Sequence, residues 1–429
     1  MTDLLWPGDE RAADIFADAA VLAAMIQVEA AWLGALADAG VAPPPAADDL
    51  HGLLDDADIP QIAAAAESGG NPVIPLLNRL RPRLAARNAA AATWLHKGLT
   101  SQDTLDTALV LCLRTATAVM HEQLLSQVYC LSALAHRHRS TPMPGRTLTQ
   151  HAVPITAGLK FATWLTQILD ARDHLSAVTA ALPIQLGGAA GSLAAITALA
   201  DAAERTDAAE RTDPAMAEHP QRAARAGAAD GARRLVAATA AALGLPVRDP
   251  WHTNRIPITR IGDALVTCTD AWGRIANDVL TGSRPEIGEL VEEPAEGHGG
   301  SSAMPNKRNP VLAVLVRRAA LAAPGLAATL HVAAASTVDE RADGAWHVEW
   351  ATLRALARRT AAAGSQMSEL LRRLTVDTER MAATLAAARP GIDAEQRSIA
   401  PDAAPGEPYS GAANEIIDAA LDRAREVAP

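Results

Sequence analysis

The feature that most constrains the fold is a long apolar run at helical spacing within residues 104–125. In this run Leu109, Leu113, Ala116 and Met120 recur every three or four residues, which places them on one helix face. Similar patterns predict further long helices over 156–180, 226–243, 259–281 and 311–336. Helices of this length, apolar on several faces, favour an extended all-α bundle over a small globule.

The composition supports this prediction. Apolar residues make up 49% of the 429, but aromatic residues make up only 3%, so Ala, Leu and Val supply most of the apolar surface. Ala and Leu are the strongest helix formers, and their small or unbranched side chains allow helices to pack closely. Few segments have the pattern of a β-strand.

The charge balance and the cysteines restrict the function. The formal net charge is -11, which argues against a nucleic-acid surface but allows a local cationic pocket for an anionic substrate. Cys112, Cys130 and Cys268 lack the spacing of a metal site, so we expect buried free thiols in a reducing cytoplasm. Neither a signal peptide nor an apolar run of about 18 residues is evident, so we expect a soluble protein without a membrane segment.

Several segments interrupt the helical pattern. Pro and Gly divide residues 1–95 into what we expect to be short helices, and the charged repeat at 201–214 predicts a solvated, partly helical insertion. Residues 388–411, rich in Pro, Gly and Ala, predict a loop or linker before a final short helix. The glycines of LGGAAGSL (186–193) follow no clear strand, so we expect tight helix packing there and no dinucleotide site.

The segment EGHGGSSAMPNKRNPV (296–311) is the least helix-like part of the chain. Asn309 is a suitable N-cap and Pro310 a suitable first residue for the helix that follows. The free N–H groups of a helix start attract anions, and Lys307 adds positive charge beside them. Backbone donors and a cation would also help a serine in this loop lose its proton. The alternative is a surface loop before a capped helix.

Two other polar segments also precede helices. In LHKGLTSQDTLDTA (95–108), Thr100 or Ser101 can cap the next helix, with Asp103 completing a capping box. The same hydroxyls are suitable carboxylate donors. His96 in this segment could simply bridge two helices.

The segment GRTLTQHAVPITAG (145–158) offers Thr147 and Gln150 as carboxylate donors and His151 as a proton carrier near neutral pH. The alternative is a turn whose polar groups are satisfied locally. Arg255 in WHTNR and Arg341 in DERADGAWHVEW could each bind a carboxylate through two hydrogen bonds, although most arginines lie on the surface without such a role.

Together these segments resemble the fumarase/aspartase superfamily. GSSAMPNKRNP is similar to its signature loop, G-S-S-x-M-P-x-K-x-N, at nearly every fixed position. HKGLTSQDTLDTALVL, GRTLTQHAVPITAGLK, IQLGGAAGSLAA, PWHTNR and DGAWHVEW resemble, in order, the branch of 3-carboxy-cis,cis-muconate cycloisomerases of the bacterial protocatechuate pathway. The likeness extends from about residue 20 to 385.

The resemblance implies a subunit of three helical domains and a homotetramer with a core of long helices from all four chains. The domains would be an N-terminal unit, a central bundle with the signature loop at 296–310, and a reduced C-terminal unit that keeps the family's last helix in PYSGAANEIIDAALDRA. Their expected limits are 1–95, 96–355 and 356–429. Each active site would combine three chains, through the segments around Thr100, Gln150 and Ser301.

The family moves a proton on the carbon next to a carboxylate, through an enediolate-like dianion that prearranged donors must stabilise. The resemblance makes Ser301 the candidate proton carrier, with Lys307 and His151 as the other catalytic candidates. It implies a small di- or tricarboxylate substrate, and neither a cofactor nor a metal. The expected substrate-binding residues are His96, Thr100, Ser101, Thr147, Gln150, Arg255, Ser302, Met304, Asn309 and Arg341.

The implied reaction closes 3-carboxy-cis,cis-muconate into 4-carboxymuconolactone, by carboxylate addition and protonation of the neighbouring carbanion. Fumarases and argininosuccinate-type lyases carry a histidine at the position of Leu148, where it suits a leaving group that needs an acid. Two alternatives stay open. One is a superfamily lyase that releases fumarate from a succinyl-type substrate whose leaving group needs little protonation, and the other is a non-catalytic structural tetramer.

Overall fold

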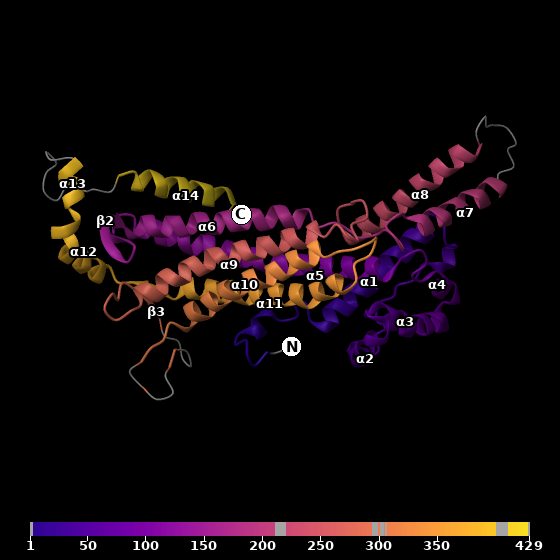
Figure 1. Cartoon of the computed structure of the whole chain (residues 1–429), viewed down its shortest axis with the longest axis horizontal. Helices are drawn as coiled ribbons and strands as arrows, with labels where there is room; N and C mark the ends of the chain where they lie inside the picture. Colours follow the sequence, from indigo (N-terminus) through magenta and orange to yellow (C-terminus); the bar gives the residue numbers. More distant parts are fainter. Residues whose placement is uncertain are drawn as a thin grey trace.

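The computed structural model shows an elongated bundle of long helices, with a thin helical arm at one end and two small sheets at the other (Figure 1). This confirms the prediction of an all-α architecture. The structure describes residues 3–210, 220–293, 299–300, 304, 307–399 and 411–427.

Five long helices form the body of the bundle. They are α5 (Ser101–Arg137), α6 (Ala157–Ala180), α9 (Ile256–Gly282), α10 (Val311–Ala335) and α11 (Gly344–Arg372). α5 packs against α6 and α11, and α9 packs against α6, α10 and α11. The helical periodicity in the sequence placed α5, α6, α9 and α10 correctly, because their apolar faces are the surfaces that meet in the core, but it did not predict α11.

Shorter elements surround this body. The helices are η1 (Asp9–Ala12), α1 (Asp18–Asp38), η2 (Pro44–Ala46), η3 (Asp56–Asp58), α2 (Ile59–Gly69), α3 (Val73–Arg87), α4 (Ala89–Trp94), α7 (Ala194–Glu210), α8 (Pro220–Leu243), α12 (Thr378–Ile392), α13 (Ala394–Ile399) and α14 (Ala413–Val427). The strands are β1 (Pro142–Thr147), β2 (Gln150–Thr156), β3 (Leu290–Glu292) and β4 (Leu374–Val376). Each sheet is one antiparallel pair, β1 with β2 and β3 with β4.

Some local predictions were wrong. The N-terminal region is not made only of short helices, because α1 runs for 21 residues and packs on α5 and α8. Of the predicted loop at 388–411, residues 388–392 and 394–399 are helical, since α12 continues past Pro390 and α13 follows it. Residues 400–410 lie outside the described residues. The last helix, α14, is where the sequence placed it. Of the charged repeat at 201–214, the part up to residue 210 is helical and the rest lies outside the described residues.

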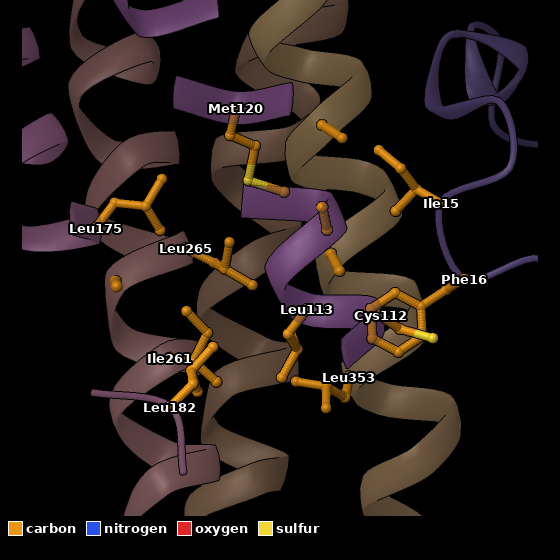
Figure 2. Packing of buried hydrophobic residues seen from close by; sticks show 14 of the residues in the cluster. Ile15, Phe16, Cys112, Leu113, Met120, Leu175, Leu182, Ile261, Leu265 and Leu353 are labelled. Carbon is orange, nitrogen blue, oxygen red and sulfur yellow. The ribbon is translucent and has the colours of Figure 1, made fainter. Parts of the chain in front are cut away.

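The core lies between the long helices and is closed on one side by the N-terminal segment. Figure 2 shows side chains from several elements meeting there. The labelled residues are Ile15, Phe16, Cys112, Leu113, Met120, Leu175, Leu182, Ile261, Leu265 and Leu353. The three cysteines are free, but only Cys112 and Cys268 are buried as predicted, and Cys130 is partly exposed. Burial raises the pKa of the Cys112 and Cys268 thiols to about 12.

Two findings modify the predicted organisation. The expected domain boundary at 355/356 falls inside α11, which is one continuous helix, so a third unit can begin only after Arg372. The division into three domains stays a prediction.

Contrary to our expectation, α1 and α10 are both long and apolar enough, by length and composition, to cross a membrane. Half of the apolar stretch of α1 is buried within the chain, but only 33% of that of α10.

Candidate active site

The predicted site residues that the structure describes fall at the two opposite ends of the bundle. α5 is 37 residues long, which corresponds to about 55 Å at the rise of an α-helix. Thr100 caps its first turn, and the β1–β2 hairpin, which carries His151, follows its last turn. Figure 1 shows the hairpin at one end of the bundle and α1 and α4 at the other. The two groups of residues in one chain therefore cannot touch the same small substrate.

At the first end, three predicted residues come together at the start of α5. Thr100 is its N-cap and Ser101 its first residue, and the expected capping box with Asp103 is present. The Arg341 guanidinium, from the segment before α11, donates to the Thr100 hydroxyl and to the backbone carbonyl of Ala189, the latter at 3.0 Å. A cation and a hydroxyl thus share the start of a helix, which is a suitable site for a carboxylate.

Asp103 holds the glycine loop against the start of α5. Its buried carboxylate accepts hydrogen bonds from the backbone N–H groups of Gly187 and Gly188, at 2.8 and 2.9 Å, and lies 3.1 Å from Nε2 of His252. We had predicted that these glycines allow tight helix packing. This was wrong, because they lie in a loop. A Cβ on Gly187 would lie 2.4 Å from the His252 ring, so the close approach of this loop requires glycine there.

Arg255 belongs to a buried ion cluster beneath this surface. Its guanidinium, only 2% exposed as a residue, donates to both carboxylate oxygens of Asp106 and of Glu349, and Trp346 Nε1 donates to Asp106 at 2.9 Å. Burial alone would lower the pKa of Arg255, but the two carboxylates outweigh it and raise that pKa. Burial raises the pKa of Glu349, since one arginine cannot fully compensate two buried acids. These contacts do not support the predicted role of Arg255 as a substrate ligand.

His96 lies in the turn between α4 and α5. Its Nδ1 is 2.7 Å from Oε1 of Glu29, a fully buried residue on α1. Its backbone is left-handed, with a φ of 61°. The sequence analysis suggested that His96 bridges two helices, and the contact with α1 is such a bridge.

At the second end, the predicted residues Thr147, Gln150 and His151 all lie exposed on the β1–β2 hairpin. Thr147 pairs with Gln150 across a two-residue turn formed by Leu148 and Thr149. Both turn residues have positive φ, 46° and 70°, as a tight hairpin turn of this kind requires. Neither residue is glycine or asparagine, so the turn carries backbone strain at the hairpin tip.

The hairpin is attached to the bundle at its base. Arg146 donates two hydrogen bonds of 2.7 Å to the carboxylate of Glu289, which is buried. On the other side, a groove of about 550 Å³ separates β2 from α12 and α13, and Gln150 and His151 line it. The tip is therefore fixed in position while its polar side chains stay accessible.

The described residues of the signature loop lie at this same end, before α10. Ser301 and Ser302 lie outside the described residues. Lys307 and Met304 are exposed, and Asn309 closes the base of the loop, where its backbone N–H and its side-chain amide donate to the carbonyl of Gly299 at 2.9 and 3.3 Å.

The first turn of α10 differs from the prediction. Pro310 is the N-cap, one residue later than expected, and the helix begins at Val311. The carboxylate of Glu292 accepts hydrogen bonds from the backbone N–H groups of Leu312 and Ala313, at 3.1 and 3.2 Å. A protein carboxylate thus already occupies these two donors, which we had expected to attract a substrate anion.

The sequence analysis missed the buried acids that organise the first end. It treated Asp103 only as part of a cap and did not single out Glu29, Asp106 or Glu349. A signal was present, because Asp103 and Asp106 are three residues apart and so share the face of α5 that enters the core. An acid on a buried helix face needs a buried partner, which here comes from distant segments.

Comparison with protein families identifies one match. A family model described as "Lyase" matches residues 9–211 and 208–325. This match extends over most of the chain and includes both ends of the bundle.

Comparison with individual proteins gives similar enzymes along almost the whole chain. A nitrosuccinate lyase from Streptomyces davaonensis is 43% identical over 371 residues, which are 86% of this chain and 73% of that protein. A 3-carboxy-cis,cis-muconate cycloisomerase from Bradyrhizobium diazoefficiens is 36% identical, over 89% and 78% of the two chains. The crystal structure of the 3-carboxy-cis,cis-muconate lactonizing enzyme from Pseudomonas putida superposes with a TM-score of 0.78 at 30% identity, and 97% of each chain is covered.

Proposed function

The chain belongs to the fumarase/aspartase superfamily of lyases, and from this premise we propose that it is a cycloisomerase that lactonises 3-carboxy-cis,cis-muconate. The observation that carries the proposal is the structural match to the lactonizing enzyme from Pseudomonas putida, which covers 97% of both chains. At the hairpin tip, Leu148 is 95% exposed and stands where, by the resemblance, fumarases and argininosuccinate-type lyases carry a histidine acid. A cyclisation has no departing group, so an apolar side chain is compatible with it.

The proposed mechanism needs one C–C double bond to react. A substrate carboxylate oxygen bonds to one carbon of the double bond, and the electron pair moves to the neighbouring carbon, which lies next to another carboxylate. Ser301 delivers the proton to that carbon, with His151 as the alternative carrier, and Lys307 stabilises the negative charge that develops. The step consumes one proton overall, which solvent returns to the deprotonated carrier, and no substrate bond other than the C–C π bond is broken.

The remaining residues would bind the carboxylates. Arg341 and Thr100 already share a hydrogen bond, and Ser101 stands beside them at the start of α5. Thr147 and Gln150 would supply donors from the hairpin. Ser302, Met304 and Asn309 belong to the loop, where Asn309 would act by holding the loop base closed.

We propose a homotetramer in which three chains complete each site, because the two ends of one bundle are too far apart to share a substrate. The surface of α10 supports this. Only 33% of its apolar stretch is buried in a single chain, and Val314, Leu321 and Val332 are exposed. Burial of such a surface against partner helices is favourable, by about 25 cal/mol per Å² of apolar area. We also propose that the tetramer is a soluble cytoplasmic enzyme.

A second candidate is the elimination of nitrite from nitrosuccinate to give fumarate, which the 43% identity to a nitrosuccinate lyase favours. Ser301 would then remove a proton from the carbon next to a carboxylate, and the C–N bond would break with its electron pair leaving on nitrite. Nitrite is a weak base and leaves without an acid, so Leu148 is compatible with this reaction also. The two candidates differ in substrate and share the site.

One assay separates the candidates. Purified protein is mixed with 3-carboxy-cis,cis-muconate, and loss of the diene absorbance with lactone formation is followed. A parallel sample with nitrosuccinate is analysed for fumarate and nitrite. We expect rapid lactonisation, and turnover of nitrosuccinate alone would replace the proposal with the second candidate.

The Ser301→Ala variant tests whether the site performs catalysis. We expect its turnover to fall by at least about a hundredfold, the lower range for loss of a general acid or base, with the tetramer intact by size-exclusion chromatography. Near-normal turnover in this variant would contradict the assignment of Ser301. No turnover of either substrate by the intact wild-type tetramer would favour the structural alternative.

A further inference from the structure

A buried carboxylate behind His96 has a role that the mechanism above does not use. Glu29 lies on α1 and is fully buried. Its Oε1 is 2.7 Å from Nδ1 of His96 and accepts a hydrogen bond of 2.8 Å from the hydroxyl of Thr104, on α5. Its other oxygen, Oε2, is buried without a hydrogen-bond partner in the described part of the chain.

The same face of α1 also fixes the turn that carries His96. Trp32, one helical turn after Glu29, donates from its indole Nε1 to the backbone carbonyl of Lys97 at 2.9 Å. The left-handed backbone of His96 costs energy, which the hydrogen bond from Trp32 to the next residue offsets. α1 therefore holds both the backbone and the ring of this residue, four positions before Thr100.

We propose that Glu29 is a positioning residue for His96, which it holds with Nδ1 toward α1 and Nε2 toward the substrate beside Thr100 and Arg341. This rests on the proposed function, in which His96 contacts the substrate. The ring is 16% exposed, and Nε2 has no hydrogen-bond partner among the described residues.

The arrangement gives the imidazole a defined tautomer. A carboxylate at Nδ1 requires the proton on that nitrogen, which leaves Nε2 as the nitrogen that faces the ligand. The hydrogen bond from Nδ1–H to Glu29 holds the ring in one orientation. The second nitrogen is thus presented to a ligand in a fixed direction.

A purely structural role explains the cluster less well. An unpartnered buried carboxylate oxygen is unfavourable, and apolar side chains of similar size often replace buried charged groups with no loss of stability. The methionine side chain is close in size to glutamate and would satisfy the packing of α1 alone. A positioning role requires the acid.

The activity test is a double-mutant cycle with Glu29→Met and His96→Asn, on whichever of the two substrates the wild type turns over. We expect Glu29→Met to lower kcat/KM by at least about tenfold with no lower thermal midpoint. In the His96→Asn background it should have no further effect, because Glu29 acts through His96. Equal losses in both backgrounds, or a lower midpoint that accounts for the loss, would overturn the proposal.

Asp263→Asn is the matched control, since it removes the acid from an exposed histidine pair with His331. We expect it to leave kcat/KM unchanged. A loss as large as that of Glu29→Met would mean that any histidine–acid pair produces the effect, and would overturn the proposal.

A second readout needs no substrate and so separates failure of this proposal from failure of the proposed function. In protein labelled with ¹⁵N-histidine, the signal that disappears in His96→Asn is assigned to His96. We expect the tautomer protonated on Nδ1 in the wild type and loss of that preference in Glu29→Met. The Nε2-protonated tautomer in the wild type, or an unchanged spectrum in Glu29→Met, would overturn the proposal.

Discussion

The two ends of the bundle hold their polar groups in opposite ways. At the α5 start, acids and their partners are buried and bonded to one another, as in the contacts of Arg255 with Asp106 and Glu349. At the hairpin end, Gln150 and His151 are exposed and line an open groove. The polar groups at the α5 start are paired within one chain, whereas Gln150 and His151 at the hairpin end face solvent in the described structure.

This difference indicates which part of the site is arranged when a single chain folds and which part is completed only when chains assemble. Buried hydrogen-bonded networks stabilise one arrangement of the core, so the α5 start is fixed when the chain folds. Exposed side chains on a strained turn contribute little to stability, and such strain is common where function requires it. Substitutions at the hairpin end should therefore lower the activity but leave the free energy of unfolding almost unchanged.

The largest expected effect is that of Arg255→Met, which leaves Asp106 and Glu349 buried without their cation. We expect a loss of about 3–5 kcal/mol in the free energy of unfolding. The thermal midpoint at fixed protein concentration measures it, since assembly makes the midpoint depend on concentration. An unchanged thermal midpoint together with a raised KM would instead mean that Arg255 binds the substrate.

The next effect is that of His151→Ala at the hairpin end. If His151 carries a proton, kcat should fall by about a hundredfold, while the midpoint stays unchanged because the side chain is exposed. His51→Ala, at another exposed histidine, serves as the control. A normal kcat would remove His151 from the catalytic candidates and leave Ser301 alone.

A smaller effect is expected for Arg341→Met, at the surface of the α5 start. It removes a charged donor to a substrate carboxylate, so KM should rise by about tenfold with little change in kcat. Steady-state kinetics would give both constants. A fall in kcat at unchanged KM would mean that Arg341 acts only in the transition state.

The smallest effect is a pH dependence of stability, which arises at Asp58, also at the α5-start end of the bundle. Hydrogen bonds from Arg83, together with Arg79, lower the pKa of the buried Asp58 to about 2. A lowered pKa stabilises the fold fully above the ordinary value of about 4, and this contribution is lost as the pH falls through about 2. Asp58→Asn should therefore lower the thermal midpoint at neutral pH and match the wild type near pH 2. An equal difference at both pH values would contradict the assigned pKa.

Much of the fold could be predicted from the sequence, because helical periodicity reports which faces are buried. The apolar spacing around Leu113 and Met120 located α5, the longest helix described. The β1–β2 hairpin could not be predicted in this way. Its turn residues, Leu148 and Thr149, lack the Asn-Gly or Asp-Gly signal of a tight turn, and its short strands contain three prolines.

The candidate site was predictable only in part. The polar residues at helix starts were found because caps and anion sites share a local pattern, as at Thr100. The partners of Arg255 could not be found, since Asp106 and Glu349 are 149 and 94 residues away from it in the sequence. Local sequence gives no information on such distant contacts.

The central claim, that separate chains complete each site, is tested most directly by hybrid tetramers. Arg341→Glu affects the α5 start and Ser301→Ala the signature loop, and each variant alone should be nearly inactive. The two variants are co-expressed with different tags, and tetramers that carry both tags are purified. If Arg341 and Ser301 of one site come from different chains, each is intact in about half of the sites, so both are intact in about a quarter of them. The account predicts that about this fraction of wild-type activity returns. Hybrids no more active than the two parent variants would contradict it.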